Sequence, residues 1–159
     1  TGKTLTALAT DLKLHRDAVI VVPNGLGHVW KWEVRKWCSA SATASVAESA
    51  RSFRSVRPRV NPHPSFRFCI LSYERFASMV ASPDERRVLV ESLAHATLIL
   101  DECHHLPDDS AVVDVCMAAR YRMLASATPF VNLHDFPRLM KVCSGRAKFP
   151  TDTGAVTDA

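Results

Sequence analysis

The stretch Leu98-Ile99-Leu100-Asp101-Glu102-Cys103-His104 decides the fold and places the candidate chemistry. The run from His95 to Leu100 is short, apolar and in part β-branched, which is typical of a buried strand. In α/β proteins, ligands bind at the carboxyl ends of the parallel strands, where Asp101 and Glu102 would lie. One such carboxylate can hold a Mg²⁺ ion while its neighbour orients a water. The alternative is an ordinary acidic turn after a strand.

The first four residues, Thr1-Gly2-Lys3-Thr4, match the end of the phosphate-binding loop pattern, G-K-[ST]. Glycine lets the backbone approach phosphates, and amide groups at a helix start point at the anion. Lys3 can supply charge to the β and γ phosphates, and the Thr4 hydroxyl can ligate Mg²⁺. Leucines at helical spacing from Leu5 to Leu14 predict the helix that this loop requires. We expect the chain to begin inside this loop, since the first half of the pattern is not in the sequence.

Segments with strand and helix patterns alternate along the rest of the chain. The expected strands are Asp17–Pro23, a short one near Ala44–Val46, Phe66–Ser72, Thr97–Asp101 and Tyr121–Ala125. The expected helices after Leu14 are His28–Cys38, one beginning at Tyr73, Ser82 to about His95, Ser110–Ala119 and Leu133–Val142. Because the strands are apolar without alternation, they predict an α/β domain with a mostly parallel central sheet. Residues 149–159 have no periodicity and are expected to be a tail or a linker.

Composition is that of a globular domain. The 159 residues are 47% hydrophobic and 23% charged, enough for one domain with a core. No apolar run approaches the roughly 20 residues that span a membrane, so no membrane role is expected. The net charge of +4 fits a polyanionic partner without requiring one. Five widely spaced cysteines without a CxxC pair indicate reduced thiols in an intracellular protein.

Three local features allow more than one interpretation. Residues 51–67 hold five arginines and no acid, and their prolines argue against regular structure, so this stretch is either a nucleic-acid groove or a solvated loop. Cys103, His104 and His105 have no partner spacing for zinc, so a zinc site is not expected. Of the three tryptophans, we expect Trp37 and one other to pack in the core.

The order of these motifs resembles the first RecA-like lobe of superfamily 2 helicases and translocases. Within that group it is most similar to the Snf2-type ATPases and related viral nucleoside triphosphatases. The resemblance covers most of the chain and rests on five segments, namely Thr1–Thr4, Val21–Asn24 with Val29–Glu33, Leu71–Glu74, the DEAH-like box Asp101–His104, and Ser126–Asn132. It implies a three-layer RecA-like P-loop domain over residues 1–143, with residues 144–159 as a tail or the start of a linker to a second lobe.

The resemblance also implies roles for single residues at the nucleotide site. Thr1, Gly2, Lys3 and Thr4 would bind ATP. Asp101 would hold Mg²⁺ together with Thr4, and Glu102 would position and activate the attacking water. Lys3, Asp101 and Glu102 would therefore be the catalytic residues.

Other implied roles concern coupling and the polymer. His104 would link the nucleotide site to Ser126 and Thr128, which would pass the state of the γ-phosphate to the nucleic-acid site. The residues expected along the nucleic-acid path are Asn24, Gly25, Tyr73 and Asn132. Two residues or segments depart from the pattern of the family. Cys103 stands where many relatives have Ala, which is a small change. Ser-Ala-Thr at residues 126–128 is closer to the helicase form of this motif than to the Gly-Thr form frequent in Snf2 relatives, so the subfamily stays open.

The implied activity is ATP hydrolysis coupled to movement on nucleic acid, with DNA as the expected polymer. The alternatives are an RNA helicase, a restriction-type translocase, or an ATP-binding regulatory module that does not hydrolyse ATP. A second RecA-like lobe with its arginine finger would be a partner in cis, and such a finger is worth about 10³–10⁵ in rate. We therefore expect these 159 residues alone to hydrolyse ATP negligibly. A cellular Snf2-type protein would be nuclear, whereas a viral one leaves the compartment open.

Overall fold

A computed structural model describes residues 2–14, 16–38, 42–58, 66–128 and 135–144. Helices and strands alternate through most of this part of the chain. The strands are β1 (Asp17–Val22), β2 (Thr43–Val46), β3 (Arg67–Ser72), β4 (Ala96–Asp101) and β5 (Tyr121–Ala125). The helices are α1 (Gly2–Leu14), α2 (Gly27–Trp37), α3 (Ala50–Val56), α4 (Tyr73–Ala81), α5 (Pro83–Leu93), the 3₁₀ turn η1 (Cys103–His105), α6 (Ser110–Met117) and α7 (Asp135–Ser144).

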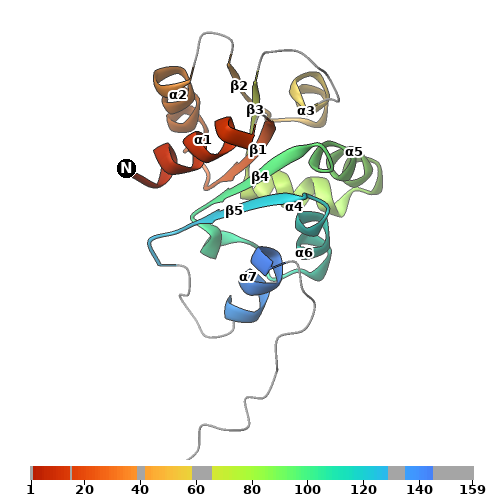
Figure 1. Ribbon diagram of the computed structural model, residues 1–159. Helices are drawn as coiled ribbons and strands as arrows, with labels where there is room; N and C mark the ends of the chain where they lie inside the picture. The colour runs from red at the N-terminus through yellow and green to blue at the C-terminus, as the bar shows by residue number, and fades with distance from the viewer. Residues whose placement is uncertain (1, 15, 39–41, 59–65, 129–134, 145–159) are drawn as a thin grey trace, which may run out of the picture.

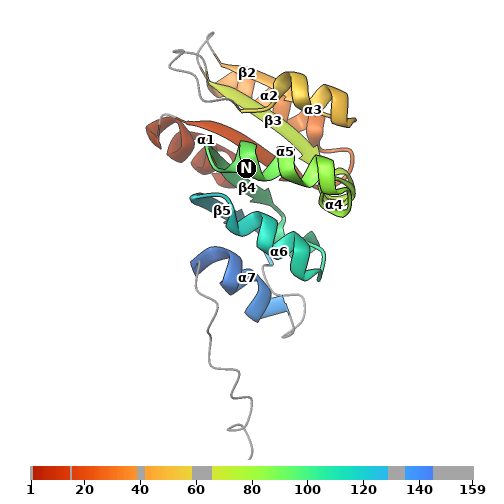
Figure 2. The ribbon, with the colours of Figure 1, turned by 90° about the vertical axis from the view of Figure 1, so that its right-hand side faces the viewer.

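The five strands form one sheet in the order β2-β3-β1-β4-β5, and every pair is parallel. Figure 2 shows the strands following one another in this order from the top of the molecule downwards. The central strand β1 pairs Ile20 with Ile70 on one side and with Ile99 on the other. The predicted α/β fold with a parallel sheet is confirmed. Because all strands run the same way, the carboxyl ends of β1, β3, β4 and β5 meet at one edge.

Helices cover both faces of the sheet, which gives three layers. Figure 1 shows α1 and α2 on one side and α3, α5 and α6 on the other. Alternate residues of β1 serve the two faces: Ile20 packs in the cluster that contains Leu8 and Trp30, whereas Val21 packs in the cluster that contains Phe53 and Phe76. A strand that is buried on both faces must be apolar throughout, which explains the lack of alternation in the sequence.

Two local expectations need correction. Residues 51–67 are not irregular throughout, because they begin within α3 (Ala50–Val56). Its N-cap Ser49 forms a capping box with Ser52, and Phe53 is fully buried. The prolines lie beyond this helix, so they limit its length and do not prevent it. Trp37 is not a core residue: it ends α2, is 46% exposed and donates to Glu33.

No helix within the described residues is both long and apolar enough to cross a membrane.

Candidate functional site

The carboxyl end of β4 carries the two acidic residues around which the site is built. Asp101 is the last residue of the strand and is 8% exposed, whereas Glu102 lies just beyond it and is half-buried. Glu102 has φ 49° and ψ 56°, the left-handed region that non-glycine residues seldom adopt. This conformation costs about 1–2 kcal/mol. It turns the chain sharply from the strand into η1, so that the two adjacent carboxylates face different partners.

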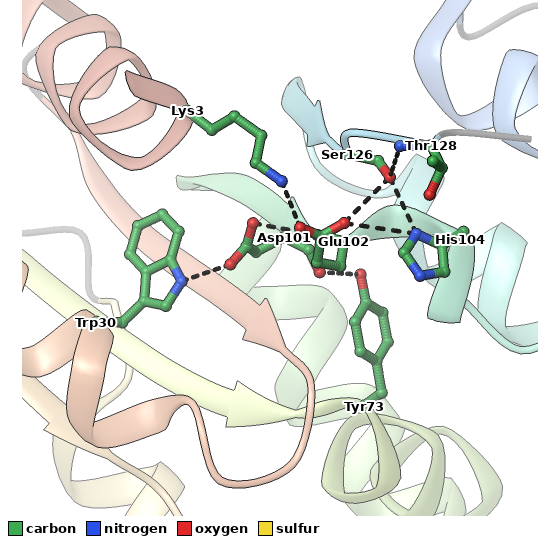
Figure 3. Close-up of polar contacts among 8 residues, drawn as sticks. All are labelled: Lys3, Trp30, Tyr73, Asp101, Glu102, His104, Ser126 and Thr128. Atoms are coloured by element: carbon green, nitrogen blue, oxygen red, sulfur yellow. Dashed lines mark hydrogen bonds and ion pairs between the residues drawn. The ribbon is translucent and has the colours of Figure 1, made fainter. Parts of the chain in front are cut away.

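Lys3 reaches this edge from the first turn of α1, as Figure 3 shows. Its ammonium group forms an ion pair with Oε1 of Glu102, across 99 residues of sequence. The hydrogen bond from Lys3, and to a smaller extent that from Ser126, lowers the pKa of Glu102 below its usual value. Glu102 is therefore held in its ionised form, as a residue that orients a water must be. Thr4 follows Lys3 in the same turn of α1.

Asp101 accepts hydrogen bonds from two aromatic side chains that come from different helices. Nε1 of Trp30, in α2, lies 2.8 Å from Oδ2 of Asp101. The hydroxyl of Tyr73, the first residue of α4, lies 3.0 Å from the backbone carbonyl of Asp101. The backbone amide of Glu102 completes the set, 3.1 Å from Oδ1. Both the side chain and the main chain of Asp101 are thus fixed by buried donors (Figure 3).

A chain of hydrogen bonds joins Glu102 to the segment that follows β5. Ser126 donates to Oε2 of Glu102 at 3.2 Å, and its oxygen lies 3.0 Å from Nδ1 of His104 and 3.1 Å from the amide of Thr128. A hydroxyl has one proton to donate. Since that proton goes to Glu102, the proton of the His104 contact lies on Nδ1. The structure thus brings together, next to Glu102, the three residues that the resemblance assigns to coupling: His104, Ser126 and Thr128.

The predicted nucleic-acid residues lie in different environments. Asn24 and Gly25 form an exposed turn after β1, where Gly25 has φ 80°, and they line a cavity of about 540 Å³ at the ends of β1, β2 and β3. Tyr73 is only 6% exposed, and burial raises its pKa above the usual value. It lines a neighbouring cavity of about 430 Å³ with Asn24. Tyr73 therefore lies beneath the protein surface and is not exposed on it as Asn24 and Gly25 are. Thr1 and Asn132 lie outside the described residues.

The five arginines of residues 51–67 do not form one described surface. Arg51 and Arg54 are exposed on α3, Arg57 pairs with Glu91 at 3.5 Å, and the amide of Arg67 donates to Asp17. Arg59 lies outside the described residues. A nucleic-acid groove and a solvated surface both remain compatible with this arrangement.

Sequence reasoning missed the hydrogen bond from Trp30 to Asp101, because it considered the tryptophans only for packing. The hydrogen bond joins residues 71 apart in the sequence, and it depends on the placement of α2 against β4. The one available signal was that a buried indole needs an acceptor for its N–H. In the described part of the chain, no group of three or more His, Cys, Asp or Glu side chains could hold a metal ion. A Mg²⁺ ion that shares its ligands with a phosphate substrate needs only one or two protein carboxylates.

Comparison with known proteins gives a family match and two curated relatives. The family model for the "SNF2-related domain" matches residues 1–145. The chain is 25% identical, over 157 aligned residues, to "Protein CHROMATIN REMODELING 19" of Arabidopsis thaliana, covering 88% of this chain and 20% of that protein. It is 30% identical, over 128 residues, to "DNA repair and recombination protein RAD54" of Oryza sativa subsp. japonica, covering 76% of this chain and 12% of that protein. The chain therefore spans a fifth or less of the length of these relatives.

Proposed function

The chain belongs to the SNF2-related domain family, and from this premise we propose that it is the ATP-binding lobe of a DNA-dependent ATPase that couples ATP hydrolysis to movement along DNA. The observation that carries the proposal is the meeting of Lys3 and Glu102 at one edge of the sheet. A lysine at a helix start beside a carboxylate that ends a parallel strand has the charges that a Mg²⁺–nucleotide site needs.

Lys3 and Asp101 would bind the charged ends of the substrate. The Lys3 ammonium would contact the β and γ phosphates, where the amides at the start of α1 add positive charge. The hard oxygens of Asp101 and of the Thr4 hydroxyl suit Mg²⁺, which binds proteins through one or two carboxylates and keeps phosphate oxygens as its other ligands. When bound, Mg²⁺ would neutralise the charge that develops on the phosphates.

Glu102 would orient the attacking water through the carboxylate that Lys3 and Ser126 now contact. Binding of the phosphates would draw Lys3 away from Glu102, since both anions compete for one ammonium group. Ser126 and His104 would then be the remaining described contacts of the Glu102 side chain, and they would hold it in place. Through the amide of Thr128, the same hydroxyl would pass a movement of Glu102 to the segment after β5.

Partners of the site would be DNA and a second RecA-like lobe in the same polypeptide. The names of the two relatives refer to chromatin remodeling and to DNA repair and recombination. These names support DNA over RNA as the polymer, and the nucleus as the compartment. The exposed turn at Asn24 and Gly25 would contact the DNA backbone, with Tyr73 supporting that surface from behind. The second lobe would supply the arginine finger, so residues 1–159 alone would hydrolyse ATP about 10³–10⁵ times more slowly than the complete protein.

The test is the ATPase rate of the full-length protein with double-stranded DNA, single-stranded DNA and RNA, each at about 50 and 200 mM salt. We expect DNA to stimulate hydrolysis, with a weaker effect at the higher salt because phosphate contacts release counterions. Lys3→Ala should abolish the stimulated rate. The control Lys13→Ala, which removes an exposed lysine from the last turn of the same helix, should leave the rate unchanged.

The other outcomes separate the alternative functions. Stimulation by RNA alone would replace the proposal with an RNA helicase. DNA stimulation accompanied by cleavage in the presence of nuclease subunits would indicate a restriction-type translocase. Tight ATP binding without hydrolysis in the presence of every polymer would show a regulatory module.

A further inference from the structure

A buried tryptophan donates a hydrogen bond to the carboxylate of Asp101. The indole Nε1 of Trp30 lies 2.8 Å from Oδ2. Trp30 is 2% exposed and Asp101 is 8% exposed, so water competes little for either partner. Figure 3 shows the indole edge pointing at this carboxylate from the opposite side to Tyr73.

These hydrogen bonds leave some lone-pair sites of the Asp101 carboxylate available to a further ligand. Two carboxylate oxygens offer about four lone-pair sites. Trp30 takes one site on Oδ2, and the amide of Glu102 takes one on Oδ1 at 3.1 Å. Each oxygen keeps a further site. Because the two donors hold different oxygens, the carboxylate cannot rotate about its Cβ–Cγ bond without breaking both hydrogen bonds.

The donor itself is held rigidly. The backbone amide of Trp30 donates to the carbonyl of Leu26 at 3.1 Å, within the first turn of α2. The indole packs in the cluster between α1, α2 and the sheet, with Leu8 and Ile99 among its members. A fixed indole beside a fixed strand end therefore sets the orientation of the Asp101 carboxylate. Packing alone would need only the bulk of an aromatic ring, whereas the hydrogen bond to Asp101 needs the indole N–H.

We propose that Trp30 is a positioning residue for the metal ion: its indole N–H orients the Asp101 carboxylate for Mg²⁺, and so sets the affinity of the site for Mg²⁺. The inference rests on the proposed function, in which Asp101 is a ligand of Mg²⁺. Donors that hold a metal ligand in place commonly change metal affinity by about 10–100-fold when they are removed.

The test measures metal affinity without turnover. The full-length protein is titrated with ADP that carries a fluorescent N-methylanthraniloyl group, first in excess EDTA and then over a range of Mg²⁺ concentrations. Trp30→Phe removes the donor and keeps an aromatic ring. We expect it to raise the Mg²⁺ concentration for half-maximal enhancement of binding by about 10–100-fold, with unchanged affinity in EDTA.

The matched control is Trp37→Phe, the same substitution in the same helix. Trp37 also donates to a carboxylate, that of Glu33 at 2.6 Å, but on the exposed surface. This variant should titrate with Mg²⁺ like the wild type. If Trp30→Phe fails to fold, 3-benzothienylalanine at position 30 keeps the shape of the indole and replaces its N–H by sulfur, and the same shift is expected.

The outcomes separate the two proposals. If the donor-free variants titrate with Mg²⁺ like the wild type while Asp101→Asn loses the response, the inference on Trp30 is overturned and the role of Asp101 stands. If Asp101→Asn responds to Mg²⁺ like the wild type, the proposed metal site itself is wrong. The inference would also be overturned if Trp30→Phe weakened the binding of the labelled ADP by the same factor in EDTA as in Mg²⁺. A general distortion of the site would lower the affinity for the nucleotide under both conditions.

Discussion

Replacing Asp11 by Asn should stabilise the domain at neutral pH and remove part of its pH dependence. Asp11 lies on α1 and is fully buried, and neither of its carboxylate oxygens forms a hydrogen bond of ordinary geometry. Burial raises the pKa of Asp11 from 3.8 to about 6, although the nearby Thr97 hydroxyl opposes this shift. An uncompensated buried carboxylate is costly when it is ionised.

The sign and size of the effect follow from the two pKa values. The folded state binds the proton more tightly than the unfolded state, so the contribution of Asp11 to stability is full below about pH 4 and is lost as the pH rises through about 6. The two pKa values differ by about two pH units, and one pH unit corresponds to about 1.4 kcal/mol. Ionised Asp11 therefore costs about 3 kcal/mol of stability above pH 7. Asn carries no charge but still lacks partners, so we expect a gain of about 1–3 kcal/mol.

The assay is urea-induced unfolding of wild type and Asp11→Asn between about pH 4 and pH 8. The difference in free energy of unfolding between them should grow as the pH rises to about 6 and then level off. Asp114→Asn, an exposed helical carboxylate with a weak contact to Lys141, should show no such difference. A difference between wild type and Asp11→Asn that is constant over this range, or that grows as the pH falls, would refute the reasoning.

Two further predictions concern the core and the coupling residues. Phe53→Ala should lower the free energy of unfolding by about 3–5 kcal/mol, because Phe53 is fully buried. The control Arg54→Ala, on the exposed side of α3, should change this free energy by less than about 0.5 kcal/mol. Equal effects of the two substitutions in urea titrations would contradict the packing of α3. Ser126→Ala removes a hydrogen bond to a charged group and should lower the DNA-stimulated kcat about tenfold. Steady-state kinetics with Ser144→Ala as control would measure it, and an unchanged kcat would reject the coupling role of Ser126.

The central strands were predictable because a strand that is buried on both faces has an apolar run without polar alternation. β1 is apolar from Ala18 to Val22 and β4 from Leu98 to Leu100, and the ends of both strands fall within one residue of the predicted bounds. Helix α3 was missed because three prolines nearby dominated the composition of residues 51–67. The capping box at Ser49 and Ser52, a local signal that precedes them, was present in the sequence.

The site was predictable only in part, for a physical reason. Parallel strands bring their carboxyl ends to one edge, so the neighbourhood of Lys3 and Glu102 follows from the fold class. Which atoms touch depends on helix placement and local backbone conformation. The left-handed turn at Glu102 and the indole of Trp30 beside Asp101 follow from such details, and no spacing in the sequence encodes them. The roles assigned to Asn24 and Gly25 stay predictions.

The proposed role of Glu102, activation of the water that attacks ATP, is tested by Glu102→Gln in the full-length protein. Gln keeps the size of the side chain and can still accept a hydrogen bond from Ser126, but it has no negative charge. The measurement is a single-turnover assay with radiolabelled ATP and saturating DNA, which records bound ATP and released phosphate separately. We expect the variant to bind ATP at least as tightly as the wild type and to release phosphate at least about 10³-fold more slowly. Phosphate release at the wild-type rate would contradict the account.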